Sequence, residues 1–143
     1  MIQGRFNYDE VGDLVCLFPE SDILYVLLLY PTSDKEKIFT RTVCLTGSQP
    51  TLPAIINVNN DEVEDLAILH CNGLLAVFIE TNAGVFDRHY LTFESDIVHT
   101  KANRTCYQLM NVADLNRNQK DDLIIIDNEK DSIRILLASP CDA

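Results

Sequence analysis

The sequence lacks the features that mark membrane-spanning and zinc-binding proteins. It has no Cys-x-x-Cys and no Cys/His spacing of the kind that holds zinc. No apolar run approaches the ~20 residues that a membrane-spanning helix needs. The longest run, Ile23–Tyr30, has the length of a β-strand. Met1–Phe6 has no charged segment leading into an apolar one, so we expect no signal peptide in this chain and no membrane insertion.

Positive charge is scarce. The chain has 11 Lys and Arg residues against 22 Asp and Glu residues, which gives a net charge of -11 and a pI of about 4.5. Nucleic acids and anionic membranes repel such a surface, so neither is expected as a partner. The acidity fits a cation-binding protein, and it fits equally a protein whose acidic surface only keeps it solvated.

Motifs for catalysis are also missing. There is no G-x-S-x-G, no H-E-x-x-H and no glycine loop that would cradle a phosphate. His70, His89 and His99 are scattered and have no Ser or Cys in motif spacing. The neighbouring carboxylates Asp121 and Asp122 would point to opposite faces of a strand. We therefore expect a protein that is not an enzyme.

The chain has five cysteines, and because the number is odd, at least one is free or pairs elsewhere. Cys16, Cys44 and Cys71 lie within or at the end of apolar segments and are expected as small core residues. Cys106 and Cys141 are candidates for a disulfide bridge. Asn103 begins the only N-x-[ST] triplet, so it is the candidate glycosylation site of a secreted protein.

What the sequence does contain is one ten-residue motif in three copies. The copies are Arg5–Leu14, Asn57–Leu66 and Asp114–Leu123. All three have Asn at the third place, Asn or Asp at the fifth, Asp at the ninth and Leu at the tenth. An apolar run follows each copy, and the ninth-place aspartates lie 52 and 57 residues apart. A repeat of that length is typical of a four-stranded β-sheet unit.

The strand pattern around the motif predicts an all-β fold of about three units, each with four antiparallel strands. A strand enters each motif, two short apolar strands follow it, and a strand that opens with phenylalanine comes next in the first two units, at Phe39–Leu45 and Phe86–Thr92. The units are predicted at 1–47, 48–97 and 98–143. The first unit has a truncated entering strand, and the third lacks its outer strand.

These residues resemble a known family. An entering strand, Asp-x-Asn-x-Asn/Asp-x-x-x-Asp-Leu and an apolar strand are similar to the FG-GAP or VCBS repeat of integrin α-subunit-type β-propellers. Phe39 and Phe86 resemble the phenylalanine near the third or outer strand of such a blade. The resemblance implies β-propeller blades, calcium in the loop between the first two strands, and roles in adhesion, ligand binding or scaffolding, usually at the cell surface or outside the cell.

The expected function is a non-catalytic module that binds a protein or a glycan. The alternatives are an accessory domain of a larger hydrolase or lyase, and a self-assembling structural unit. Three blades are fewer than the four to eight that close a propeller. Further blades or another copy of the chain are therefore expected as partners, because an open array would leave sheet edges exposed.

Oxygen atoms at the first, third, fifth and ninth places, with the seventh-place carbonyl, could converge on one Ca²⁺ ion. The candidate ligands are Asp114, Asn116, Asn118, Lys120 and Asp122 in the third copy; Asn57, Asn59, Asp61, Val63 and Asp65 in the second; and Asn7, Asp9, Val11 and Asp13 in the first. The second and third copies each offer two carboxylates, so binding should be weak and structural. The alternative is a polar loop closed by Asn and Asp side chains that accept nearby backbone N–H groups.

Two departures from the family pattern weaken the metal prediction. Arg5 stands at the first place of the first copy, where its charge would repel a cation, and we expect it to pair with Asp9 or Asp13 instead. The sixth place, usually glycine, holds Glu10, Glu62 and Gln119. A positive φ there would cost such residues about 1 kcal/mol.

Overall fold

The computed structural model describes residues 1–31, 39–47, 49–71, 74–82, 85–92, 109–127 and 132–138. These residues form β-strands and one short 3-10 helix, Pro19–Ser21, and contain no α-helix. Every strand pair among them is antiparallel. The predicted all-β class is confirmed.

The described strands form three sheets, and in each the neighbours in space are neighbours in sequence. The first sheet contains β1 (Ile2–Gly4), β2 (Asp13–Phe18), β3 (Ile23–Leu29) and β4 (Phe39–Leu45). The second contains β5 (Pro50–Ile56), β6 (Asp65–His70), β7 (Leu74–Asn82) and β8 (Val85–Thr92). The third contains β9 (Leu109–Ala113), β10 (Asp122–Asp127) and β11 (Ser132–Leu136). Within the described residues, none of the sheets closes on itself.

One strand starts earlier than its sequence indicates. Prolines usually mark a link rather than a strand, yet β5, which enters the second motif, begins at Pro50 and also contains Pro53. Because β5 is an edge strand of its sheet, a proline there removes no bond from a central ladder. The register of β5 against β6 shifts between Pro50 and Leu52, where the irregularity is accommodated.

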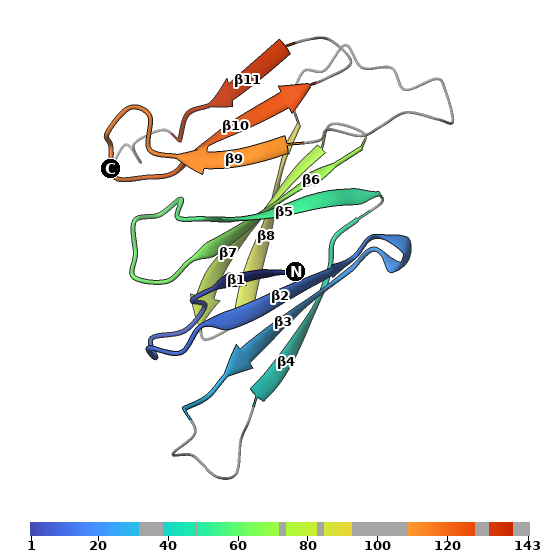
Figure 1. The fold of residues 1–143 in the computed structure, drawn as a ribbon, viewed down its shortest axis with the longest axis vertical. Coiled ribbons are helices and arrows are strands. Elements are labelled where there is room, and N and C mark those ends of the chain that lie inside the picture. The colour runs from blue at the N-terminus through green and yellow to red at the C-terminus, as the bar shows by residue number, and fades with distance from the viewer. Residues whose placement is uncertain are drawn as a thin grey trace.

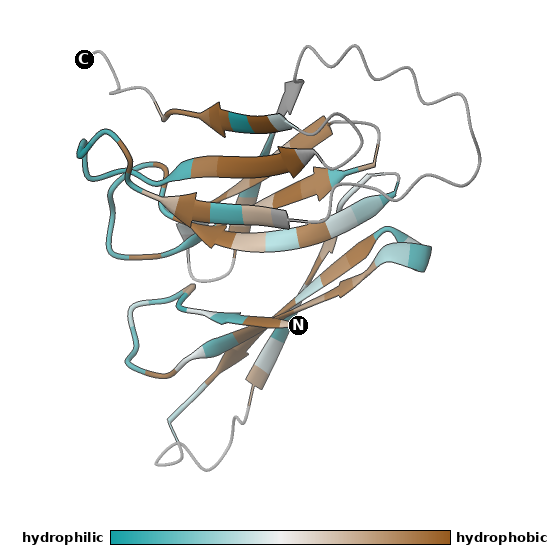
Figure 2. Cartoon of the chain, turned by 45° about the horizontal axis from the view of Figure 1, so that its top comes forward, coloured by the Kyte–Doolittle hydropathy of each residue, from teal (hydrophilic) through white to brown (hydrophobic). Residues whose placement is uncertain are grey.

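The three sheets follow one another in the order of the chain (Figure 1). Their first strands come closest, with β1 beside β5 and β5 beside β9. The three repeated motifs form the loops between the first and second strands of each sheet, and these loops lie along the same side of the molecule, at the left in Figure 1. Figure 2 shows these loops as mainly hydrophilic and the strands as mainly hydrophobic.

Apolar side chains fill the space between the first and second sheets. The buried residues of this core are Phe6, Val15, Leu24, Val26 and Leu28 from the first unit and Leu66, Ile68, Ala76 and Phe78 from the second. The rings of Phe6 and Phe86 meet edge to face, with centroids 5.7 Å apart. Side chains on one face of β2 and β3 thus pack on one face of β6 and β7.

The opposite face of the second sheet packs on the third sheet. Ile56, Ala67, Leu75 and Val77 share a core with Leu123, and Leu69 packs with Ile125. Because both of its faces are covered, β6 is buried at all six of its residues. A strand covered on both faces can be apolar throughout, which explains the continuous apolar run in its sequence.

The cysteines differ from the prediction at one position. Cys71 is disulfide-bonded rather than a free core residue, whereas Cys16 and Cys44 are free and partly buried. The candidate bridge between Cys106 and Cys141 and the candidate glycosylation site Asn103 lie outside the described residues. Over the part of the chain that is described, no helix is long and apolar enough to cross a membrane.

Candidate binding face formed by the repeat loops

Each repeat loop is built from two consecutive turns closed by side chains. The third-place Asn accepts the N–H of the fifth-place residue, and the fifth-place Asp or Asn accepts the N–H of the seventh. In the second loop, for example, Asn59 Oδ1 accepts the Asp61 N–H at 3.2 Å, and Asp61 Oδ1 accepts the Val63 N–H at 3.0 Å. Asn and Asp favour such turns because their short side chains reach the backbone two residues on.

The ninth-place aspartate of each loop is buried and joins two distant stretches of backbone. Asp65 accepts the Val58 N–H at 3.1 Å and the Glu80 N–H at 2.8 Å. Asp13 accepts the N–H groups of Phe6 and Leu29, and Asp122 accepts those of Leu115 and Ala138. One oxygen of each carboxylate therefore holds the start of the loop, and the other holds the end of the third strand or the residues just after it.

Burial and hydrogen bonding act in opposite directions on these carboxylates. Burial raises the pKa of Asp65 above its ordinary value, while the Val58 and Glu80 N–H groups oppose the rise and nearby Asp61 adds to it. Burial likewise raises the pKa of Asp13, against the N–H groups of Phe6 and Leu29. In both cases the loss of solvation outweighs the stabilisation of the charge by the backbone.

The loops are also joined across the sheets by a repeated pair of hydrogen bonds. The Arg5 N–H donates to Glu64 Oε2 at 2.5 Å, and the Glu64 N–H donates to the Arg5 carbonyl at 2.9 Å. Asn57 and Asp121 repeat the arrangement, at 2.7 Å and 2.9 Å. The first place of one loop thus pairs with the eighth place of the next, where both residues are acidic.

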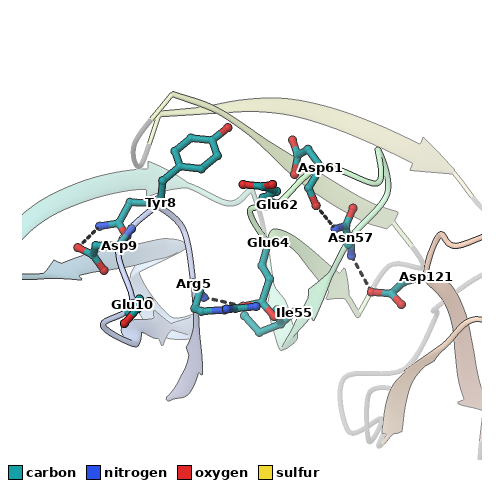
Figure 3. Close-up of a pocket in the computed structure, with 11 residues that line it drawn as sticks. Arg5, Tyr8, Asp9, Glu10, Ile55, Asn57, Asp61, Glu62, Glu64 and Asp121 are labelled. Carbon is teal, nitrogen blue, oxygen red and sulfur yellow. Dashed lines mark hydrogen bonds between the residues drawn. The ribbon is translucent and has the colours of Figure 1, made fainter.

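A cleft of about 490 Å³ lies between the first and second loops (Figure 3). Its lining is acidic around a single arginine and includes a tyrosine that is 72% exposed, Tyr8. The lining residues are Arg5, Asn7, Tyr8, Asp9, Glu10, Ile55, Asn57, Asp61, Glu62, Glu64 and Asp121. Several residues predicted as metal ligands are therefore gathered at this cleft, whereas Asp13 and Asp65 are completely buried and do not line it.

All of the side chains predicted as calcium ligands accept backbone N–H groups. They are Asn7, Asp9, Asp13, Asn57, Asn59, Asp61, Asp65, Asp114, Asn116, Asn118 and Asp122. Among the described residues, no group of three or more His, Cys, Asp or Glu side chains is placed to hold a metal. The donor set is still all oxygen, as calcium requires, and each oxygen that accepts one N–H keeps a second lone pair.

The first loop differs from its prediction. Arg5 was expected to pair with Asp9 or Asp13, but no ion pair joins them within the described residues; the Asp13 carboxylate is occupied by two N–H groups, and the Arg5 backbone bonds to Glu64. The expected strain at the sixth place occurs only at Gln119, with φ of 65°. Glu10 and Glu62 do not have positive φ values. Left-handed residues occur instead at the fourth place of the second and third loops, Asn60 at φ of 59° and Arg117 at φ of 60°.

Histidine provides no catalytic arrangement among the described residues. His70 is buried, and its two ring nitrogens lie 3.0 Å from the Leu74 carbonyl oxygen and 2.9 Å from the Thr46 carbonyl oxygen. His89 lies on the exposed part of β8, and His99 lies outside the described residues. His70 thus has a structural role in joining the end of the first sheet to the second.

Comparison with known proteins identified no relative: no family model, no curated protein and no solved structure matches the chain.

Sequence reasoning missed the eighth-place residues Glu64 and Asp121. The sequence does distinguish these positions: the eighth place is acidic in the second and third copies, whereas the first copy has Gly12 there. Within the described residues, the acidic eighth places belong to the two loops that pair with a preceding loop.

Proposed function

We propose that the chain is a non-catalytic, propeller-type interaction module that binds a partner through the face formed by its repeat loops. The observation that carries the proposal is the cleft between the first and second loops. It combines a hollow surface, acidic side chains and exposed Tyr8, and aromatic residues are enriched in protein interfaces. The partner is accordingly a protein that presents a basic segment.

Hydrogen bonds hold the repeat loops in place before any ligand binds. Their side chains are bonded within each loop and across the sheets, so little conformational entropy is lost when a ligand binds. The acidic lining would attract a basic segment over a distance, which raises the rate of association and makes it dependent on salt. The disulfide at Cys71 supports an extracellular or cell-surface location, because disulfides persist in oxidising compartments.

Calorimetry with a lysine-rich peptide and a glutamate-rich peptide of equal length tests this proposal. The lysine-rich peptide should bind, more weakly at high salt, and the combined variant Asp61→Asn and Glu62→Gln should lower its affinity about tenfold. Glu20→Gln, in the Pro19–Ser21 turn outside the cleft, is the matched control and should change nothing. Equal binding of both peptides, or of neither, would overturn the proposal, and binding on a glycan array alone would replace the protein partner with a glycan.

A structural calcium ion in the second and third loops is the other part of the proposal. Its support is the oxygen donor set of each loop and the acidic surroundings. Calcium that binds only the folded chain should raise the melting temperature at millimolar concentration, and chelator should reverse the rise. Asn116→Ala should reduce the shift assigned to the third loop. No shift with calcium would show that hydrogen bonds alone close the loops.

A further inference from the structure

Among the described residues, the two outer sheets each leave one face uncovered, and both faces carry exposed apolar side chains. On the third sheet, Ile133 is 67% exposed and Ile135 is 55% exposed. On the first sheet, Phe39 is 53% exposed, and Val43 and Leu45 on the same face of β4 are also exposed, with Arg41 between Phe39 and Val43. Exposed apolar side chains gathered on one face of a sheet mark sites where another molecule packs.

Strand register shows which covered positions correspond to the exposed ones of the third sheet. Ile133 pairs with the fifth residue of β10, as Leu24 pairs with that of β2 and Leu75 with that of β6. Leu24 and Leu75 are completely buried, each by the sheet that follows its own. Ile135 corresponds in the same way to Val26 and Val77, which are also buried. The uncovered face of the third sheet is therefore the face that the next sheet covers.

The uncovered face of the first sheet is the complementary one. Phe39 lies opposite Leu29, at the place that Phe86 takes opposite Glu80 in the second sheet. Phe86 packs on the preceding unit, where its ring meets Phe6, the second residue of the first loop. The second residue of the third loop is Leu115, which is 46% exposed. Phe39 corresponds to Phe86, and Leu115 corresponds to Phe6. Phe39 of one copy and Leu115 of another could therefore form the contact that Phe86 and Phe6 form within the chain.

The first and third loops also contain a donor and an acceptor that could form one more hydrogen bond between loops. Glu64 and Asp121 each donate a backbone N–H to the first-place carbonyl of the preceding loop. The corresponding donor of the first loop is the Gly12 N–H, and the corresponding acceptor of the third loop is the Asp114 carbonyl. Within the described residues, no hydrogen bond reaches either group.

We propose that the third sheet of one copy of this chain packs on the first sheet of a second copy, head to tail, and that two copies close a ring. Each copy contributes three sheets, so the ring has six, within the four to eight that close a propeller. A head-to-tail contact that closes gives a ring of defined size rather than a fibre. The two new junctions repeat the sheet packing of the two that each chain already contains, but Gly12 supplies no carboxylate like that of Glu64 or Asp121.

Charge favours a second copy over an unrelated unit with an acidic eighth place. The first place of the third loop is Asp114, whereas the other two loops have Arg5 and Asn57 there. An acid opposite Asp114 would bring two carboxylates together, which is unfavourable. The eighth place of a second copy's first loop is Gly12, which has no charge but keeps the N–H that the Asp114 carbonyl would accept.

Size-exclusion chromatography with light scattering tests the proposal on the full chain. The mass should be twice 16.2 kDa and should fall towards 16.2 kDa on dilution. Phe39→Asp and Ile135→Asp alter the two opposite faces at exposed positions, and each alone should raise the dissociation constant of the dimer about 100-fold. Far-UV circular dichroism and the melting temperature of each variant, measured at low concentration, verify that its fold is retained.

Mixing the two variants gives the sharpest result. In a mixed dimer, one junction combines the intact third sheet of the Phe39→Asp chain with the intact first sheet of the Ile135→Asp chain. The mixture should therefore dimerise at concentrations where neither variant does so alone. Tyr8→Asp, which places an acid at an exposed residue on neither face, is the control and should remain dimeric.

Four outcomes would overturn the proposal. A wild-type chain that is monomeric at every concentration would assign the uncovered faces to sheets of another chain or segment. A mass above two copies would exclude closure by two. An effect of only one of the two variants, or no recovery on mixing, would exclude the head-to-tail arrangement. None of these results depends on the ligand of the loop face, so the proposed function is tested separately.

Discussion

The second and third sheets carry similar apolar residues in different surroundings. Leu75 in β7 and Ile133 in β11 occupy the same place in their sheets, yet Leu75 is completely buried and Ile133 is largely exposed. The second sheet lies between two others, and in the described structure the third has a neighbour on one face only. Burial at this place is therefore decided by the neighbouring sheet and not by the strand.

This difference explains the unusual apolarity of the strands. In the strands of an antiparallel sheet that has one face in water, residues should alternate between apolar and polar. β10 contains Leu123, Ile124, Ile125 and Ile126 in succession, which is the pattern of a strand covered on both faces, as β6 is. The third sheet thus has the composition of a covered sheet without, among the described residues, the second cover.

The largest predicted effect separates the two sheets. Leu75→Ala removes a completely buried side chain and should lower the free energy of unfolding by about 2–5 kcal/mol. Ile133→Ala at the corresponding place should cost less than about 1 kcal/mol in the monomer, because its side chain is already in water. Urea unfolding at a concentration low enough to avoid association measures both. Equal losses would contradict the difference in burial.

A smaller effect is expected at the ninth-place aspartates. Asp65→Ala leaves the Val58 and Glu80 N–H groups without acceptors beneath the third sheet and should cost about 2–4 kcal/mol. Asp122 is as buried as Asp65, but one residue whose N–H it accepts, Leu115, is 46% exposed. Water can therefore reach this N–H once the carboxylate is removed, and Asp122→Ala should cost about 1–2 kcal/mol. Thermal unfolding of both variants gives the order, and a larger loss at Asp122 would refute the explanation.

The bonds that join the loops across the sheets are more exposed and should contribute less. Glu64→Ala removes the acceptor of the Arg5 N–H and should lower the free energy of unfolding by about 1 kcal/mol. Glu62→Ala, two residues earlier in the same loop, is the matched control and should be neutral, since no hydrogen bond of its side chain is found within the described residues. Indistinguishable urea midpoints for the two variants would argue against a role for Glu64 in joining the sheets.

The smallest effect is a dependence on pH. Because burial raises the pKa of Asp65, the folded chain binds this proton more tightly than the unfolded chain does. The ionised group therefore disfavours the folded state, and its contribution to stability is greatest below the ordinary Asp pKa of about 4. As pH rises through the raised pKa, the stability of the wild type should fall relative to Asp65→Asn. The free energies of unfolding of the two proteins are measured from about pH 3 to 7. If their difference does not change with pH, the pKa of Asp65 is not raised.

Much of the fold was predictable because the signals are local. The repeated motif located all three loops, and the apolar runs after it located β2, β6 and β10 within a residue or two. Phe39 and Phe86 were recognised as equivalent, and strand register bears this out. A strand whose residues alternate between apolar and polar, or which is rich in β-branched residues, can be predicted from a short window of about five to eight residues, whatever packs on it.

The candidate site was less predictable because its contacts span long distances in the chain. The ninth-place Asp was predicted as a metal ligand, but its partners at Leu29 and Glu80 lie 16 and 15 residues further on. Arg5 and Glu64 are 59 residues apart, and Asn57 and Asp121 are 64 apart. No local pattern shows which backbone N–H a buried carboxylate will accept once the sheets have packed.

Amide hydrogen exchange measured at low and at high protein concentration tests the central claim most directly, namely that neighbouring sheets decide the stability of each sheet. At low concentration, β6 and β7 should exchange most slowly, and β10 and β11 should exchange faster. At high concentration, protection of β10, β11 and β3 should rise as the uncovered faces meet, while β6 stays unchanged. Equal exchange in all three sheets, independent of concentration, would contradict the account.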